Sequence, residues 1–175
     1  LLFSGAVSKG KFDFLPEVLE ELSVKKGFHK VAQRPGKPFW FGYTTPSNKG
    51  EQSLNKTEKF NIKRQAVIFA FPGNPISTFV NCLAYFCPWY QKSVGLKETV
   101  ETAILEVDTT FKPSLVYFLQ VKLTYKSGKL FAIPVTGNGS GDLASLVNAD
   151  AFIQLPNNKN YFKKGEVYPV LRYRN

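Results

Sequence analysis

Two loops and a basic segment hold the residues whose types and spacing could do chemistry. The first loop, residues 4–13, follows an apolar stretch and contains glycines and one carboxylate. The second loop is residues 71–77, and the basic segment 30–38 lies between the two in the sequence. Glycine lets backbone N–H groups approach an oxyanion closely, and a helix start after a loop adds its positive dipole end. Together the three segments predict a site for one anionic ligand, such as phosphate, molybdate or sulfate.

Taken in their order along the chain, these three segments resemble three motifs of the MoeA/gephyrin family, the molybdopterin molybdenumtransferases. The first motif, Ser-Gly-Gly-Val-Ser-x-Gly-x-x-Asp, is matched by residues 4–13 with Ala6 in place of the second glycine. The second, Lys-x-x-x-Lys-Pro-Gly-Lys-Pro, is matched by residues 30–38 with Arg34 in place of a lysine. The third, Pro-Gly-Asn-Pro-x-Ser, is matched without a change by residues 72–77. Further matches at 137–140 and 164–167 extend the resemblance over nearly the whole chain.

The resemblance implies an activity and a set of site residues. In the family, molybdate is inserted into adenylylated molybdopterin and AMP leaves in a step that needs a divalent cation. Asp13 is then a catalytic carboxylate and the ligand of Mg²⁺, a hard cation that prefers oxygen. Lys30 and Arg34 are catalytic cations that hold molybdate or phosphate oxygens. The substrate-binding set implied in the same way is Gly5, Ser8, Gly10, Lys37, Pro72, Gly73, Asn74, Pro75, Ser77 and Ser140.

Several of these residues also have a plainer interpretation. Asp13 suits a helix cap, and Lys30 and Arg34 suit a solvated strand edge. Ser140, in a glycine-rich segment, is more typical of a turn. Many relatives carry an arginine after an aromatic residue where this chain has Gln120, and this difference would weaken an anion contact from the second half of the chain.

The first half of the chain mixes helical and strand patterns. Apolar residues at 15, 18, 19 and 22 predict a helix with Pro16 in its first turn. Residues 28–32, 38–43 and 65–71 are β-forming, and the polar residues 44–64 between the last two predict a mobile excursion of a hairpin. Asn74 and Pro75 suit a helix cap and first turn, and an apolar stripe follows as far as Gly95. Pro88 should kink this helix or mark its last turns.

From about residue 96 the pattern changes to strands and turns. Strands are predicted at 103–107, 115–125, 130–135 and 167–173, with a turn at 126–129. We therefore predict an α/β fold in two domains. The first, residues 1–95, is a three-layer α/β/α molybdopterin-binding domain truncated at its N-terminus, and the second, residues 96–175, is a small β-barrel-like domain.

Composition argues against several other classes of protein. No apolar run approaches the roughly 18 to 20 residues that cross a bilayer, and no signal sequence is evident, so a cytoplasmic location is expected. The net charge of +10 is spread over turns and one polar segment, which argues against a nucleic-acid partner, and no membrane partner is expected. We interpret Cys82 and Cys87 as reduced cysteines whose role is side-chain packing. The sole histidine, His29, has no serine or cysteine motif beside it, which argues against a hydrolase triad or a zinc site.

The chain contains no methionine, and residue 1 already lies in a strand pattern. We therefore expect a C-terminal fragment, or the ordered remainder of a longer protein, that is inactive alone. The resemblance implies a homodimer whose active site lies between the catalytic domain of one subunit and an N-terminal domain of the other. The resemblance also makes the molybdopterin adenylyltransferase a candidate partner protein. Two rival functions stay open: that adenylyltransferase activity itself, and a non-catalytic gephyrin-like scaffold.

Overall fold

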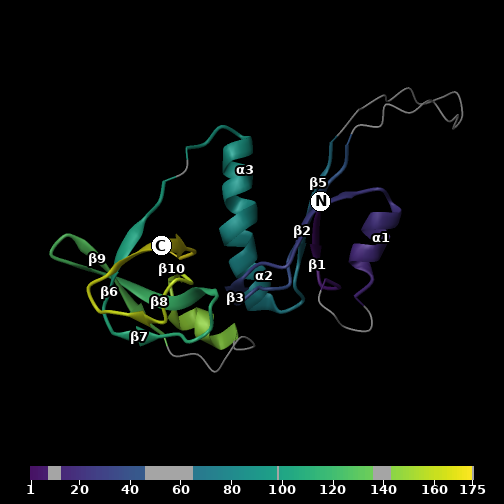
Figure 1. Ribbon diagram of the computed structural model, residues 1–175. Coiled ribbons are helices and arrows are strands. Elements are labelled where there is room, and N and C mark those ends of the chain that lie inside the picture. The colour runs from purple at the N-terminus through teal and green to yellow at the C-terminus, as the bar shows by residue number, and fades with distance from the viewer. Residues whose placement is uncertain (8–12, 46–64, 98, 136–142, 175) are drawn as a thin grey trace, which may run out of the picture.

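The computed structural model describes residues 1–7, 13–45, 65–97, 99–135 and 143–174 (Figure 1). The residues predicted at Ser8, Gly10 and Ser140, and most of the polar segment 44–64, lie outside these ranges. The helices are α1 (Leu15–Glu21), α2 (Pro75–Asn81), the π-helical η1 (Cys82–Phe86), α3 (Cys87–Ser93) and the 3-10 helix η2 (Leu143–Asn148). Within the described ranges, no helix is both long and apolar enough to cross a membrane.

The strands form a four-stranded sheet in the first half and a larger sheet in the second (Figure 1). In the first sheet the order is β1-β5-β4-β2, with β1 parallel to β5 and the other pairs antiparallel. The strands of the chain are β1 (Leu2–Ser4), β2 (Lys25–His29), β3 (Gln33–Arg34), β4 (Trp40–Tyr43), β5 (Val67–Phe71), β6 (Thr102–Leu105), β7 (Thr109–Thr110), β8 (Val116–Lys126), β9 (Lys129–Pro134), β10 (Ala151–Leu155), β11 (Tyr161–Phe162) and β12 (Val167–Arg172).

The two central strands of the first sheet, β4 and β5, are covered on both faces, which fits their nearly continuous apolar sequences. Trp40, Ile68 and Ala70 pack on one face with Leu19 of α1. Neighbouring positions in β4 and β5 put phenylalanine rings on the other face, where η1 covers them. The expected three-layer α/β/α domain is not confirmed, since the structure consists mostly of strands and α1 spans only seven residues.

A helical rod made of α2, η1 and α3 runs on from Pro75 to Ser93. Asn74 caps it as predicted, because its side chain accepts a hydrogen bond from the Ser77 N–H at 2.9 Å, and Pro75 lies in the first turn. Pro88 does not end the rod. It lies in the first turn of α3, directly after a π-turn that shifts the backbone pairing by one residue around the missing proline donor.

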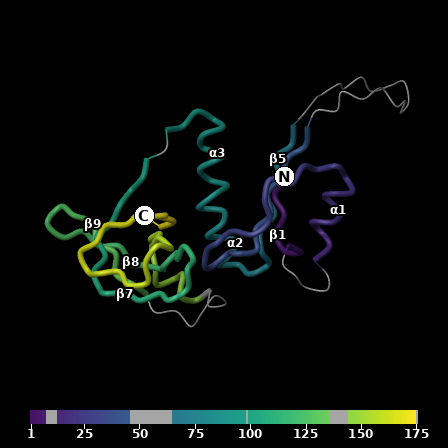
Figure 2. The backbone as a smooth tube through the Cα atoms, viewed as in Figure 1, coloured from purple at the N-terminus to yellow at the C-terminus, as the bar shows by residue number. Residues whose placement is uncertain are grey.

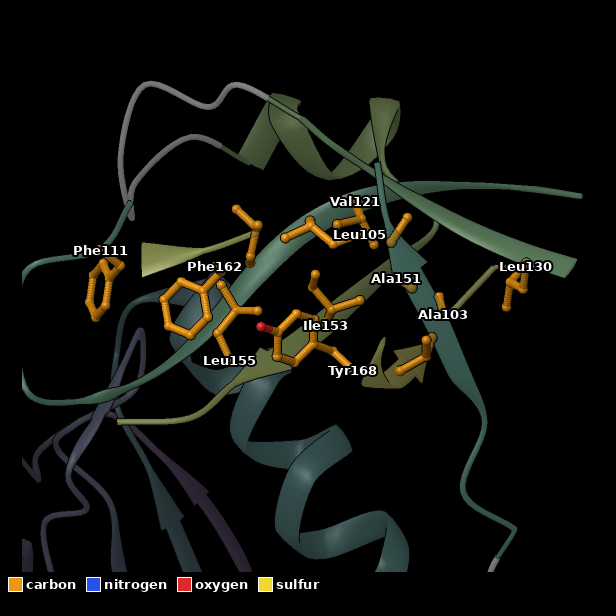
Figure 3. Close-up of a cluster of buried hydrophobic side chains, with 13 residues drawn as sticks. Ala103, Leu105, Phe111, Val121, Leu130, Ala151, Ile153, Leu155, Phe162 and Tyr168 are labelled. Carbon is orange, nitrogen blue, oxygen red and sulfur yellow. The ribbon is translucent and has the colours of Figure 1, made fainter. Parts of the chain in front are cut away.

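The second half contains a closed barrel. Its strands follow the order β10-β12-β6-β9-β8, and β10 also pairs with β8, so the last strand meets the first. Figure 3 shows the barrel interior, where Leu105, Val121, Ile153 and Leu155 fill the centre. The prediction of a barrel-like second half is therefore confirmed. Strand β10, which closes the barrel, was missing from the predicted strands.

The helical rod lies between the first sheet and the barrel (Figure 2). Ile76 and Val80 of α2 form a buried cluster with Phe118 of β8 and Phe152 of β10. The chain also crosses directly between the halves, because β3 pairs in parallel with the start of β8. These contacts set the position of the segment 30–38, which carries the predicted cations.

Candidate functional site

The structure brings the first loop (residues 4–13) and the second loop (residues 71–77) together. Strands β1 and β5 are parallel neighbours, so their carboxyl ends meet at one edge of the sheet. The Gly5 N–H donates to the Phe71 carbonyl at 3.0 Å, and a Cβ built on Gly73 would lie 3.7 Å from the Gly5 Cα. Gly5 has a φ of 92°, a conformation that favours glycine. The two glycine loops therefore form one surface.

Within the segment 72–77 the side chains have separate tasks. Gly73 and Pro75 are exposed, whereas Pro72 and Ser77 are buried. The Thr78 hydroxyl donates to the Pro72 carbonyl, and the Asn74 oxygen is used in the helix cap. The most exposed residues of this segment are thus Gly73 and Pro75.

The first loop is anchored on its β1 side. Val7 is buried in the core beneath α1, and its carbonyl lies 2.9 Å from the His29 Nε2. His29 thus ties the first loop to β2, a structural contact that the sequence did not indicate. Asp13 is half-buried just before α1, and the residue at the helix N-cap is Phe14. The structure therefore does not place Asp13 at the cap position that the plainer interpretation gave it.

The basic segment forms a closed loop between β2 and β4, called the basic loop below (residues 30–38). The Lys30 N–H donates to the Phe39 carbonyl at 2.7 Å, and the Val31 N–H donates to the Lys37 carbonyl at 3.0 Å. Lys30 has a φ of 75°, in a region that residues other than glycine rarely adopt. Such strain costs about 1 to 3 kcal/mol and concentrates at functional sites, where the surrounding structure enforces it.

A buried polar network holds the basic loop against the helical rod. Gln33 Nε2 donates to the Pro35 carbonyl at 2.9 Å and to Asn81 Oδ1 at 2.7 Å. Asn81 Nδ2 in turn donates to the Gly36 carbonyl at 3.0 Å, and the Tyr85 hydroxyl donates to Gln33 Oε1. Gln33 and Asn81 are almost completely buried. Since buried amides are costly unless they are hydrogen-bonded, this network fixes one loop conformation.

The same network explains why glycine stands at position 36. Its φ is 89°, and a Cβ there would lie 2.5 Å from Asn81 Oδ1 and 2.9 Å from Gln33 Nε2. The loop and the rod are therefore in direct backbone-to-side-chain contact. Sequence reasoning missed Gln33, Asn81 and Tyr85; the available signal was Asn81 alone, a polar residue within an apolar stretch, and it did not indicate a partner.

Arg34 lies at the junction of the two halves, opposite Tyr117 in the β3–β8 pairing. Both residues line a cavity of about 90 Å³, together with Gln120 and Ser145 of the second half. Burial raises the pKa of the Tyr117 hydroxyl, and the charge of Arg34 opposes part of that shift. Gln120 Oε1 is buried and, among the described residues, has no hydrogen-bond partner. Gln120 therefore does face the same junction as the basic loop.

The cations of the basic loop are not neutralised within the described part of the chain. Lys37 and Arg34 are exposed and Lys30 is half-buried, and none of the three forms an ion pair with a described carboxylate. An anion bound by the loop would therefore not have to displace a described internal partner. Among the described residues, no shared contact joins the side-chain ends of Lys30 and Arg34, so their convergence on one anion stays a prediction.

Comparison with known proteins identifies relatives of both halves. Residues 102–173 match the family model described as the MoeA C-terminal region (domain IV). The chain is 38% identical over 170 residues to a molybdopterin molybdenumtransferase of Synechocystis sp., with 97% of this chain and 37% of that protein aligned. It is 31% identical over 178 residues to the Bacillus subtilis protein of the same name, with 99% and 37% aligned. The chain thus spans little more than a third of the length of these relatives.

Solved structures agree on the fold. A molybdopterin biosynthesis moeA protein from Pyrococcus horikoshii has a TM-score of 0.62 and 22% identity, covering 91% of this chain and 39% of that one. A molybdenum cofactor biosynthesis protein from Pyrococcus furiosus has a TM-score of 0.61 and 23% identity, covering 95% and 56%. At these identities the likeness establishes the fold.

Proposed function

We propose, from the confirmed resemblance of this chain to the MoeA/gephyrin family, that it forms part of a molybdopterin molybdenumtransferase. The proposed reaction inserts molybdate into adenylylated molybdopterin and releases AMP. The observation that carries the proposal is the basic loop itself: three cations without described acidic partners stand on a loop that buried amides hold in one conformation. An immobile cationic loop is suited to an oxyanion, because fixed charges need not reorganise when the anion binds.

In this proposal Lys30 and Arg34 hold the oxygens of molybdate, a tetrahedral dianion, or of a substrate phosphate. A guanidinium can donate two parallel hydrogen bonds to such an anion, and an ammonium acts as a point charge. Lys37 adds positive charge from the same loop. The adjoining surface at Gly5 and Gly73 lets a ligand approach the backbone closely, because neither residue has a side chain in the way.

In this proposal, Asp13 is the protein ligand of Mg²⁺. Within the described ranges no group of three histidine, cysteine, aspartate or glutamate residues could hold a metal ion. A single carboxylate is still compatible with Mg²⁺, which keeps several waters and binds through one or two carboxylates and substrate phosphates. Asp13 would hold the ion, and the ion would supply positive charge to the phosphate that leaves with AMP.

The assembly is proposed on the same basis. The named relatives are more than twice as long as this chain, so we propose that activity needs the remainder of such a protein. We further propose a homodimer, a complete three-layer α/β/α domain in the full-length protein, a cytoplasmic location and a handover of substrate from the molybdopterin adenylyltransferase. The adenylyltransferase reaction itself is the less favoured function, since the relatives described above carry the molybdenumtransferase name.

The test is AMP release by the full-length protein from adenylylated molybdopterin in the presence of molybdate and Mg²⁺. The Arg34→Ala variant should lower the rate at limiting molybdate by about tenfold to a hundredfold, because a charge-assisted hydrogen bond contributes about 1.5 to 3 kcal/mol. Lys92→Ala, an exposed cation on α3, is the matched control and should leave the rate unchanged. A wild-type protein without turnover, or equal losses in both variants, would contradict the proposal.

A further inference from the structure

The two cysteines of the chain face each other on the helical rod. Cys82 Sγ and Cys87 Sγ are 4.0 Å apart, and both residues are free thiols of intermediate burial. They are the only cysteines in the sequence. Their proximity is not what a regular helix would give. In an α-helix, residues five apart are rotated by ~140° about the axis, so their side chains point to different faces.

The π-turn η1 is the reason that the thiols meet. It spans Cys82–Phe86, and the Cys87 N–H donates to the Cys82 carbonyl, a pairing of residues five apart. This widened turn stacks Cys87 above Cys82, about one helical pitch of ~5 to 6 Å away along the rod. Disulfides join residues whose Cα atoms are about 4.4 to 6.8 Å apart, and the pitch of such a turn falls in this range.

The pair is open to small reagents from one side. Cys87 lines a groove of about 800 Å³ between the rod and the barrel, where Gln91, Glu101 and Arg172 also lie. Cys82 instead packs against the phenylalanine cluster of the first sheet. Cys87 is therefore the thiol that a reagent in the groove meets first, and Cys82 is positioned to react second.

We propose that Cys82 and Cys87 are a redox-active dithiol that closes to a disulfide across the π-turn by exchange with a small disulfide such as oxidised glutathione. The Cys87 thiolate attacks one glutathione sulfur, which breaks the glutathione S–S bond and releases one glutathione. Cys82 then loses its proton to solvent and attacks the Cys87 sulfur, which expels the second glutathione. Two electrons pass from the protein to the two glutathione molecules, and these take up the two protons that the protein loses.

The order of attack agrees with the titration of the half-buried Cys82 thiol. Burial, with a further contribution from Cys87, raises the pKa of Cys82 to about 11. Cys82 therefore keeps its proton near neutral pH, and ring closure should accelerate as the pH rises, since the thiolate is the attacking species. The same turn presents Tyr85 to Gln33, so the disulfide forms in the element that anchors the basic loop.

The experiment equilibrates the purified protein in glutathione buffers of increasing oxidised fraction, quenches it with acid and digests it with trypsin. Both cysteines fall in one peptide, residues 65–92, because no lysine or arginine lies between its first residue and Lys92. The wild-type peptide should lose about 2 Da, the mass of two hydrogens, with no lasting glutathione adduct. In the Cys82→Ser variant, which lacks the second thiol, the Cys87 adduct should persist.

Two results would overturn the proposal. One is a wild-type peptide that holds a stable glutathione adduct as readily as the Cys82→Ser peptide does. The other is a wild-type peptide that remains a dithiol under conditions in which the urea-unfolded chain becomes oxidised. The Cys87→Ser variant is the complementary control, and its remaining thiol should react more slowly than Cys87 does in the Cys82→Ser variant.

Discussion

The barrel and the basic loop differ in how their cations are paired and held. Three cations on the barrel are paired with carboxylates: Lys126 with Glu106 at 3.0 Å, Lys159 with Glu166 at 2.7 Å, and Arg172 with Glu101 at 2.7 Å. Other barrel cations, such as Lys122 and Lys129, form no ion pair with a described carboxylate. The cations of the basic loop form no ion pair with a described carboxylate, although buried amides fix the loop itself. The basic loop thus combines unpaired cations with a fixed backbone, and this combination, rather than the lack of ion pairs alone, suits it to an anionic ligand.

The two regions also differ in how their edges are closed. The barrel has no open edge among its five main strands, because β10 pairs with both β8 and β12. The first sheet has β1 at one edge of its described strands, where Leu1 and Leu2 are 69% and 53% exposed. We therefore expect stability to reside mainly in the barrel and the rod, and ligand contacts to come from the loops of the first sheet.

The largest expected effect separates the two regions by stability. Leu155→Ala removes a completely buried side chain from the barrel core and should cost about 2 to 5 kcal/mol of unfolding free energy, because it leaves a cavity. Leu2→Ala, on the exposed edge strand, should change it by less than about 0.5 kcal/mol. Urea unfolding of both variants measures the difference. Similar losses would mean that the edge strand is as important to stability as the barrel.

A smaller effect is expected where the basic loop meets the rod. Gly36→Ala should lower the free energy of unfolding by about 2 to 4 kcal/mol. The new Cβ would meet Asn81 and Gln33, and the backbone angle is unfavourable for alanine. Gly128→Ala is the matched control: its φ is also positive, at 75°, but a Cβ there has open space around it. Its cost should be only about 1 to 2 kcal/mol. Equal costs in thermal unfolding would show that the network does not clamp the loop.

The smallest effect concerns a paired carboxylate on the barrel. Hydrogen bonds from Lys159 and Tyr168 lower the pKa of Glu166 from 4.5 to about 2. Because the folded pKa is the lower one, this contribution to stability is present above about pH 4.5 and is lost as the pH falls towards 2. The melting temperature of the wild type should drop more steeply in that window than that of Glu166→Gln. If the melting temperatures of the two proteins fall in parallel with pH, Glu166 does not contribute to the loss of stability in acid.

Local patterns in the sequence were enough to predict much of the fold. The apolar spacing at 15–22 became α1, and Asn74 with Pro75 began the rod as a cap and first turn should. Strand β10 was missed because four of its five residues are buried, so it lacks the alternation of a half-exposed strand. The π-turn was missed because it adds one residue to a turn without changing the apolar stripe.

The candidate site was predictable only in part. The motifs indicated which segments would matter, and the parallel pairing of β1 and β5 does bring two of them together. The anchoring of the basic loop was not predictable, because Gln33 and Asn81 are 48 residues apart and their hydrogen bond exists only after the rod packs against the loop. A long-range polar contact of this kind leaves no periodic signal in the sequence.

The most direct test of the basic loop as an oxyanion site is a crystal of the full-length protein soaked in molybdate, with anomalous diffraction recorded at the molybdenum absorption edge. The strongest molybdenum peak should lie within hydrogen-bonding reach of Lys30 and Arg34, and it should be lost in crystals of the Arg34→Ala variant. A well-occupied peak away from the basic loop, unchanged by that substitution, would contradict the account.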